Sequence, residues 1–130
     1  MQHLFGIGDQ QMFCREVRKE DCAAFDTGEV HPVYATFALA RDAEWCCRLF
    51  VLKMKDNTEE GIGTHLSIDH LAPAVLGSQV NFVATITAIV NHTITCSFIA
   101  TCGERLIAKG TQVQKILKKE KLSRLFTQQS

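Results

Sequence analysis

Hydrophobic and polar residues follow two different periods along the chain, and the first of these predicts a long helix. From about Tyr34 to about Met54 the sequence is mostly apolar and holds only four charged residues before Lys53. On a helix, these apolar side chains would cover most of the circumference, which is typical of a helix buried on most sides. The pattern therefore predicts one core helix, about 30 Å long at 1.5 Å rise per residue.

After the turn at 57–61 the hydrophobic period changes to two, which indicates β-strands. Leu66, Ile68 and His70 fall on one strand face, and this face is expected to lie against the helix. The same alternation predicts three further strands, over 79–91, about 94–102 and 105 to about 117, with a kink at Gly110. The turns between consecutive strands are short, so we expect these strands to be antiparallel.

The N-terminal region has a weaker pattern. A short strand is expected at about Met12 to Val17, with Phe13 facing inward. Asp21 is a plausible N-cap for one helical turn that ends at Thr27–Gly28. His31–Pro32 is expected to break the chain, because the residue before a proline is pushed out of the α region.

The order of these elements predicts the fold class. A short strand is followed by one long buried helix, then by strands joined through tight turns, and finally by a short amphipathic helix within Lys118–Ser130. A helix with apolar residues all round requires a sheet that curls about it. We therefore expect an α+β hot-dog fold, in which a curved antiparallel sheet wraps around one long central helix, as a single domain over 1–130.

Composition narrows the class of protein. The chain has 14 basic and 14 acidic residues, and this balance argues against nucleic acid or an anionic membrane as a partner. No segment is long and apolar enough for a membrane span, and the N-terminus does not resemble a signal peptide, so a cytoplasmic location is expected. The six cysteines contain no CxxC pair, so we expect structural thiols and no metal site.

His70 is the first residue that the strand pattern singles out. It shares the inward face with Leu66 and Ile68, and an inward histidine must find partners for its ring nitrogens. One interpretation is a core histidine bonded to a backbone carbonyl, which periodicity alone slightly favours. The other is an active-site residue, because Pro73 ends the strand ladder close by.

Glu44 and Thr36 are two further candidates, both in the helical segment. Glu44 interrupts an apolar stretch, and it either pairs with Arg41 or Arg48 or belongs to a site, whereas Asp42 is expected on the solvated face. Thr36 precedes Glu44 by eight residues, which places both on the same side of a helix about 12 Å apart. Alone, Thr36 would be an ordinary N-terminal helix residue. Together with a carboxylate and a histidine it would form a nucleophile, base and orienting group.

The spacing of these residues resembles that of the hot-dog thioesterases related to fluoroacetyl-CoA thioesterase. That family has a threonine, then a glutamate followed by a tryptophan eight residues later, then a Gly-Thr pair, and a histidine six residues after that second threonine. This sequence has Thr36, Glu44–Trp45, Gly63–Thr64 and His70 in the same register. The resemblance extends from about Val30 to Leu117.

The resemblance implies hydrolysis of a small acyl-CoA thioester to the free acid and CoA. Thr36 would be the nucleophile or would position a water, Glu44 would assist it, and His70 would be general base and then acid. Gly63 and Thr64 would bind the substrate, with Gly63 allowing a close backbone approach. Coenzyme A is then part of the substrate and no cofactor is implied. In this fold the site usually forms between subunits, so a homodimer or higher homo-oligomer is implied.

The resemblance does not extend to the choice of acyl group. In fluoroacetyl-CoA thioesterase, specificity for fluorine depends on aromatic lid residues before the threonine, and the stretch Thr27–His31 contains none, so fluoroacetyl-CoA is not the expected substrate. Lys115, Lys118, Lys119 and Arg105 fit either the phosphates of CoA or a solvated strand end. Two other functions stay open: a non-catalytic acyl-CoA or small-ligand binding module on the same fold, and a structural or partner-binding dimer.

Overall fold

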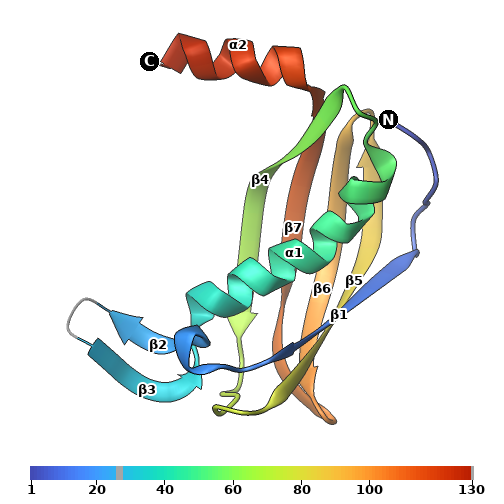
Figure 1. The fold of residues 1–130 in the computed structure, drawn as a ribbon. Helices are drawn as coiled ribbons and strands as arrows, with labels where there is room; N and C mark the ends of the chain where they lie inside the picture. The colour runs from blue at the N-terminus through green and yellow to red at the C-terminus, as the bar shows by residue number, and fades with distance from the viewer. Residues whose placement is uncertain (26–27, 130) are drawn as a thin grey trace.

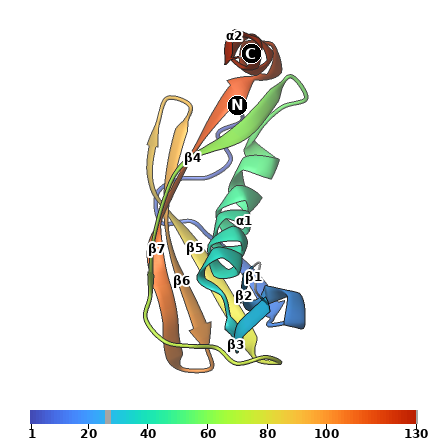
Figure 2. The same ribbon diagram turned by 90° about the vertical axis from the view of Figure 1, so that its left-hand side faces the viewer.

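A computed structural model of the chain describes residues 1–25 and 28–129. A five-stranded antiparallel sheet of order β1-β5-β6-β7-β4 curves along one side of the long helix α1, and β2 and β3 form a separate two-stranded sheet (Figure 1, Figure 2). The elements are β1 (Gln10–Glu16), a 3-10 turn (Lys19–Asp21), β2 (Cys22–Phe25), β3 (Gly28–Tyr34), α1 (Thr36–Met54), β4 (Glu59–His70), β5 (Gln79–Val90), β6 (Thr93–Cys102), β7 (Arg105–Lys118) and α2 (Lys119–Gln129). The α+β hot-dog architecture expected from the sequence is confirmed.

The N-terminal region differs from the expectation in two places. Asp21 does not begin a helical turn; it ends the turn Lys19–Asp21, because its buried carboxylate accepts a hydrogen bond from the backbone N–H of Arg18. The expected end of that turn falls partly on residues 26–27, which lie outside the described residues. His31–Pro32 does not break the chain either. It lies inside β3, where the extended geometry that proline imposes suits a strand.

The inner faces of α1 and the sheet form the core. Strand residues at every second position are buried, as their alternation predicts, including Val80, Phe82 and Ala84 on β5 and Cys96, Phe98 and Ala100 on β6. The helix is less enclosed than expected: Phe37, Trp45 and Leu52 are 55%, 41% and 39% exposed. These three residues lie on the side of α1 that faces away from the sheet.

The cysteines behave as small hydrophobic residues. Within the described residues none of the six forms a disulfide, and Cys22, Cys46, Cys47 and Cys96 are buried. Burial raises the pKa of the Cys46 thiol to about 11, so this group stays protonated near neutral pH. A hydrogen bond with Cys96, together with burial, also raises the pKa of Cys47. Protonated buried thiols are poor nucleophiles, which agrees with the structural role expected for them.

A β-bulge in β4 changes which side of that strand faces the helix. Gly63 pairs with Gln114 and His65 with Val113, so Thr64 is an extra residue in the ladder. Side chains alternate along a strand, so Gly63 and His70, seven residues apart, would otherwise point to opposite faces. With Thr64 inserted, both face α1. The bulge therefore allows one strand to meet the helix at both positions.

Gly110, where a kink was expected, causes no irregularity in the pairing of β7 with its neighbours. Gly110 pairs in register with Phe98 on β6 and with Ile68 on β4. The irregularity between β6 and β7 lies nearer the turn, where Ala100 pairs with Ala108 but Thr101 with Leu106. A side chain at position 110 would lie 2.6 Å from Cζ of Phe98, so the glycine makes room for that ring.

The predicted C-terminal helix is confirmed as α2. It leaves the sheet at the end of β7 and extends past the edge formed by β4 (Figure 1). Within the described residues, no helix is both long and apolar enough to cross a membrane.

Candidate functional site

Thr36 and His70 meet at the N-terminal end of α1. Thr36 is the first residue of the helix and His70 the last residue of β4, and Thr36 Oγ1 lies 2.9 Å from His70 Nδ1. The chain before Thr36 is held in place by backbone hydrogen bonds from Tyr34 N to the carbonyl of Ala74 (2.8 Å) and from Ala35 N to that of Asp21 (2.9 Å). The hydroxyl is therefore fixed next to the imidazole.

The two ring nitrogens of His70 have different surroundings, because only Nδ1 has a hydrogen-bond partner among the described residues. The other nitrogen, Nε2, is buried and has no hydrogen-bond partner within the described part of the chain. A cleft of about 240 Å³ adjoins the ring and is lined by Val33, His70, Leu71, Ala72 and Pro73. The hydrogen bond that the structure gives to His70 is to a hydroxyl, so the interpretation as a core histidine bonded to a backbone carbonyl is wrong.

Glu44 lies farther along α1, beside the glycines of β4. Its Oε1 accepts a hydrogen bond from Gln112 Nε2 at 3.1 Å. A side chain at Gly63 would come within 2.4 Å of the same Oε1, so the glycine permits the carboxylate to reach the sheet. No hydrogen bond joins Glu44 to Thr36 or to His70 among the residues that the structure describes. Within one chain, the structure thus brings two of the three candidate residues together.

The expected ion pairs of Glu44 do not form. Arg48 pairs with Glu60, with 2.8 Å between Nη2 and Oε1. Arg41 pairs with Asp21, with 2.9 Å between Nη2 and Oδ1. Both arginines are therefore engaged with other carboxylates, and the polar partner of Glu44 is an amide on β7.

Two glutamines complete the surroundings of Glu44, and the sequence analysis missed them. Gln112 and Gln114 are 1% and 2% exposed. Gln114 Nε2 donates to Gln112 Oε1 at 3.0 Å, and Gln112 in turn donates to Glu44. Both amides occupy inward positions of β7, in phase with buried Ile116. A polar residue at a core position of a strand usually has a specific partner, and this signal was available in the sequence.

Gly63 and Thr64 take different places at the bulge. Gly63 faces the helix, whereas Thr64 is exposed and its Oγ1 donates to the carbonyl of Val113 at 3.4 Å. Their role in substrate binding stays a prediction. The basic residues do not form one cluster, because Arg105 and Lys118 lie at opposite ends of β7, and Lys118 Nζ already bonds Thr58 Oγ1 at 2.9 Å.

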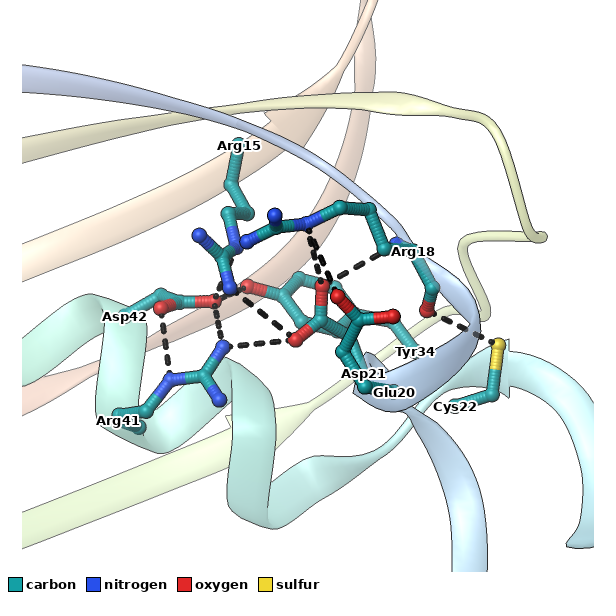
Figure 3. A network of polar contacts seen from close by, with 8 residues as sticks. All are labelled: Arg15, Arg18, Glu20, Asp21, Cys22, Tyr34, Arg41 and Asp42. Carbon is teal, nitrogen blue, oxygen red and sulfur yellow. Dashed lines mark hydrogen bonds and ion pairs between the residues drawn. The ribbon is translucent and has the colours of Figure 1, made fainter.

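The expectation for Asp42 is wrong, because this residue is buried with only 4% of its surface exposed. The Tyr34 hydroxyl donates to its Oδ2, and Arg41 donates to both of its oxygens at 3.0 Å. Figure 3 shows Arg15 and Arg41 directed at the carboxylates of Asp21 and Asp42. Besides its helix neighbour Arg41, the partners of Asp42 are Arg15 on β1 and Tyr34 on β3, which the periodicity of the helix does not indicate.

This network fixes the start of α1. Burial and the hydrogen bond to Asp42 raise the pKa of Tyr34, so the phenol remains a donor. Burial alone would raise the pKa of Asp21, but hydrogen bonds from Arg41, the backbone of Arg18 and Arg15 outweigh it and lower the pKa overall. Asp21 thus stays ionised, and its own carbonyl holds Ala35, the residue before Thr36.

Comparison with known proteins identifies the family. Residues 17–120 match the model of the fluoroacetyl-CoA-specific thioesterase family, FlK. The chain belongs to the FlK family. No curated protein sequence matches it.

Solved structures of related proteins share the fold of this FlK family member. A Thermus thermophilus hypothetical protein of the thioesterase superfamily is 31% identical, with 98% of this chain and 94% of that chain covered and a TM-score of 0.91. The fluoroacetyl-CoA thioesterase FlK itself is 19% identical, with 97% and 98% covered and a TM-score of 0.88. A hot-dog-like protein from Thermanaerovibrio acidaminovorans is 20% identical, with 97% and 93% covered and a TM-score of 0.87.

The charged network of this FlK family member makes stability depend on pH through Asp21. The pKa of Asp21 is lowered in the folded state, so its charge stabilises the fold above the unfolded-state pKa, and this contribution is lost as the pH falls through the folded-state pKa. We expect Asp21→Asn to lower the free energy of unfolding by about 2 kcal/mol near neutral pH, because the buried carboxylate then no longer accepts charge-assisted hydrogen bonds from the partly exposed guanidinium groups of Arg15 and Arg41. The difference from wild type should shrink below about pH 4.

Urea unfolding of both proteins across this pH range measures the difference. Glu20→Gln is the control, because Glu20 is the exposed neighbour of Asp21 and its ion pair with Arg18 is long at 3.6 Å and exposed. That variant should change the free energy of unfolding by less than about 0.5 kcal/mol. A difference for Asp21→Asn that stays constant down to pH 2 would contradict the assignment.

Proposed function

We propose that this protein hydrolyses small acyl-CoA thioesters to the free acid and CoA. The main support is the contact between Thr36 Oγ1 and His70 Nδ1, at 2.9 Å, in a chain of the FlK family. A hydroxyl hydrogen-bonded to an imidazole is the arrangement that general-base catalysis of acyl transfer requires. The adjoining cleft of about 240 Å³ suits a short acyl group.

The reaction begins when His70 takes a proton through Nδ1. The proton comes from the Thr36 hydroxyl, or from a water that Thr36 holds, and the resulting oxygen attacks the thioester carbonyl. The tetrahedral intermediate then collapses, the C–S bond breaks, and His70 returns the proton to the CoA thiolate. If Thr36 itself attacks, a water hydrolyses the threonine ester in a second round. The backbone N–H groups of the first turn of α1, beside Thr36, stabilise the oxyanion.

The acyl group is expected to be small and not fluorinated. Solved structures of FlK contain fluoroacetate and CoA in one case and acetyl-CoA in another. The stretch 27–31 of the present chain has no aromatic residue that would enclose fluorine. Gly63 and Thr64 are proposed to contact the substrate from β4, at the bulge. Cysteines that form no disulfide suit a reducing compartment, so we propose that the reaction takes place in the cytoplasm.

We further propose that the active enzyme is a homodimer joined through β4. This strand is an edge of the sheet, and residues 64–67 of it are exposed. An exposed strand edge offers unpaired backbone groups to another strand. In an antiparallel pair centred between His65 and Leu66, residue 70 of one copy lies opposite residue 61 of the other.

Such a dimer explains why Glu44 is remote from Thr36 and His70 in one chain. Eight helical residues separate Glu44 from Thr36 by about 12 Å. Glu44 lies beside Gly63, near the same edge, so pairing through β4 brings the partner's Glu44 toward His70. The buried Nε2 of His70, which lacks a partner, is the group that this carboxylate is proposed to orient. Each site then uses Thr36 and His70 of one copy and Glu44 of the other.

Substitution of His70 tests the catalytic proposal. The purified protein should release free thiol from acetyl-, propionyl- or butyryl-CoA, and His70→Ala should lower kcat/KM by about 10³-fold through loss of the general base. Thr36→Ala should have a comparable effect. The control is His92→Ala, which removes an exposed imidazole from the turn between β5 and β6 and should leave the rate unchanged.

The same assay separates the enzyme from a binding module. Absence of thiol release across the acyl-CoA panel overturns hydrolysis. A melting temperature that rises with acyl-CoA in wild type and in both variants, without turnover, would support the non-catalytic binding function instead.

Dimerisation through β4 is tested with a pair of equally exposed leucines. Leu66 on β4 is 38% exposed and Leu106 on β7 is 39% exposed. Leu66→Glu places two like charges near the dimer axis, so we expect a monomer by light scattering, whereas Leu106→Glu should remain a dimer. Dimers for both variants, or a monomeric wild type, would rule out this interface.

A further inference from the structure

Helix α2 carries an apolar stripe that its own chain covers only at the beginning. Leu122, Leu125 and Phe126 follow the i, i+3, i+4 spacing of one helix face. Leu122 is 7% exposed, but Leu125 is 40% and Phe126 is 60% exposed. The backbone N–H of Lys119 bonds the carbonyl of Thr58 at 2.8 Å, which anchors the first turn to the start of β4. The second half of the stripe projects from the body of the molecule.

Helix α2 points away from β7 toward the side of the molecule where the free edge of β4 lies. In Figure 1 the helix runs leftward from the upper end of β7, above β4, and its C-terminal end lies beyond the edge that the lower part of β4 forms. In Figure 2, where the β4 edge faces the viewer, α2 is seen end-on with the C-terminus in front, on the side of the sheet that carries α1. The two views agree that α2 overhangs the edge at which we propose that a second copy binds.

A second apolar patch lies at the opposite end of β4. Leu71, Val75 and Leu76, here called the apolar rim, are 52%, 55% and 50% exposed. The rim follows directly after His70, and Leu71 also lines the cleft beside that histidine. The apolar rim and the exposed half of α2 thus lie near opposite ends of the β4 edge.

Helix α2 cannot reach the rim of its own chain. The two lie at opposite ends of β4, whose 12 residues span about 40 Å at 3.3 Å each. The 11 residues of α2 span only about 16 Å. A partner paired antiparallel through β4 runs in the opposite direction. In the register centred between His65 and Leu66, its residue 72 lies opposite residue 59, next to the point where the first turn of α2 is anchored. The two-fold axis keeps both α1 helices on one side of the sheet, which is also the side of α2.

We propose that α2 of each subunit docks on the apolar rim of the other subunit, at the mouth of its substrate cleft. Leu125 and Phe126 bury their side chains against Leu71, Val75 and Leu76 of the second copy, which removes both patches from water. The helix then forms one wall of the cleft in which His70 of that copy acts. This inference rests on the β4 dimer of the proposed function, and the occupant of the rim is a second copy of this chain.

Photocrosslinking of the full-length protein tests the docking directly. A photoreactive benzoylphenylalanine replaces Phe126, and unlabelled and isotope-labelled chains are mixed before irradiation. The expected product joins position 126 of one chain to the segment 71–76 of the other, identified by mass spectrometry. The control places the same group at Arg124, on the opposite face of α2, where we expect at least ten-fold less of this product.

The mass in solution, measured on the same sample, separates the two possible failures. A monomer overturns the β4 dimer and the docking together. A dimer without the crosslink, or with a crosslink within one chain, overturns the docking alone.

Kinetics test whether α2 forms a wall of the cleft. Phe126→Glu should raise KM for the acyl-CoA about ten-fold while kcat stays within two-fold and the protein remains a dimer, because the chemistry of Thr36 and His70 is untouched. Arg124→Glu is the matched control and should leave KM unchanged. An unchanged KM in Phe126→Glu would overturn this role of the helix.

Discussion

The close approach of α1 to β4 is the constraint on which the candidate site depends. Gly61 and Gly63 have no side chains, and a Cβ at either position would lie 2.4 Å from Val51 or Glu44 of the helix. Because the helix lies so close to this edge strand, its polar side chains Thr36 and Glu44 lie near the edge of the sheet and not under its centre. The extra residue at Thr64 then turns the end of the strand so that His70 also faces the helix.

As a consequence, the candidate site residues of α1 contact β4 at two separate places. The first residue of the helix, Thr36, meets the end of β4, while Glu44 meets the middle of the same strand through Gly63 and Gln112. The free edge of β4 runs past both places, so a second copy that pairs with this edge would bring its Glu44 toward Thr36 and His70. The network around Asp21 and Asp42 holds the other side of the helix start, so the position of Thr36 is fixed from both directions.

Most of the fold could be predicted from the sequence because the helical pattern over 34–54 and the strand alternation after residue 61 occupy separate parts of the chain. His70 was found by alternation, since the strand after Thr64 keeps an uninterrupted period of two. The bulge itself has no such signal, because an extra residue is defined only by pairing with β7. Asp42 was placed on the wrong face because its partners Arg15 and Tyr34 lie on β1 and β3, outside the helix whose periodicity gave the prediction. Gln112 was detectable in principle, as an amide at a core position, but its partner Glu44 could be assigned only from the folded structure.

Mixing two inactive variants tests the central claim that each site combines residues of two subunits. His70→Ala and Glu44→Gln chains are unfolded together, refolded, and assayed for thiol release from a short acyl-CoA. In a mixed dimer one of the two sites then holds an intact His70 and an intact Glu44. Since half of the dimers are mixed, the account predicts about a quarter of wild-type activity. If the mixture is as inactive as each variant alone, the residues act within one chain and the account is contradicted.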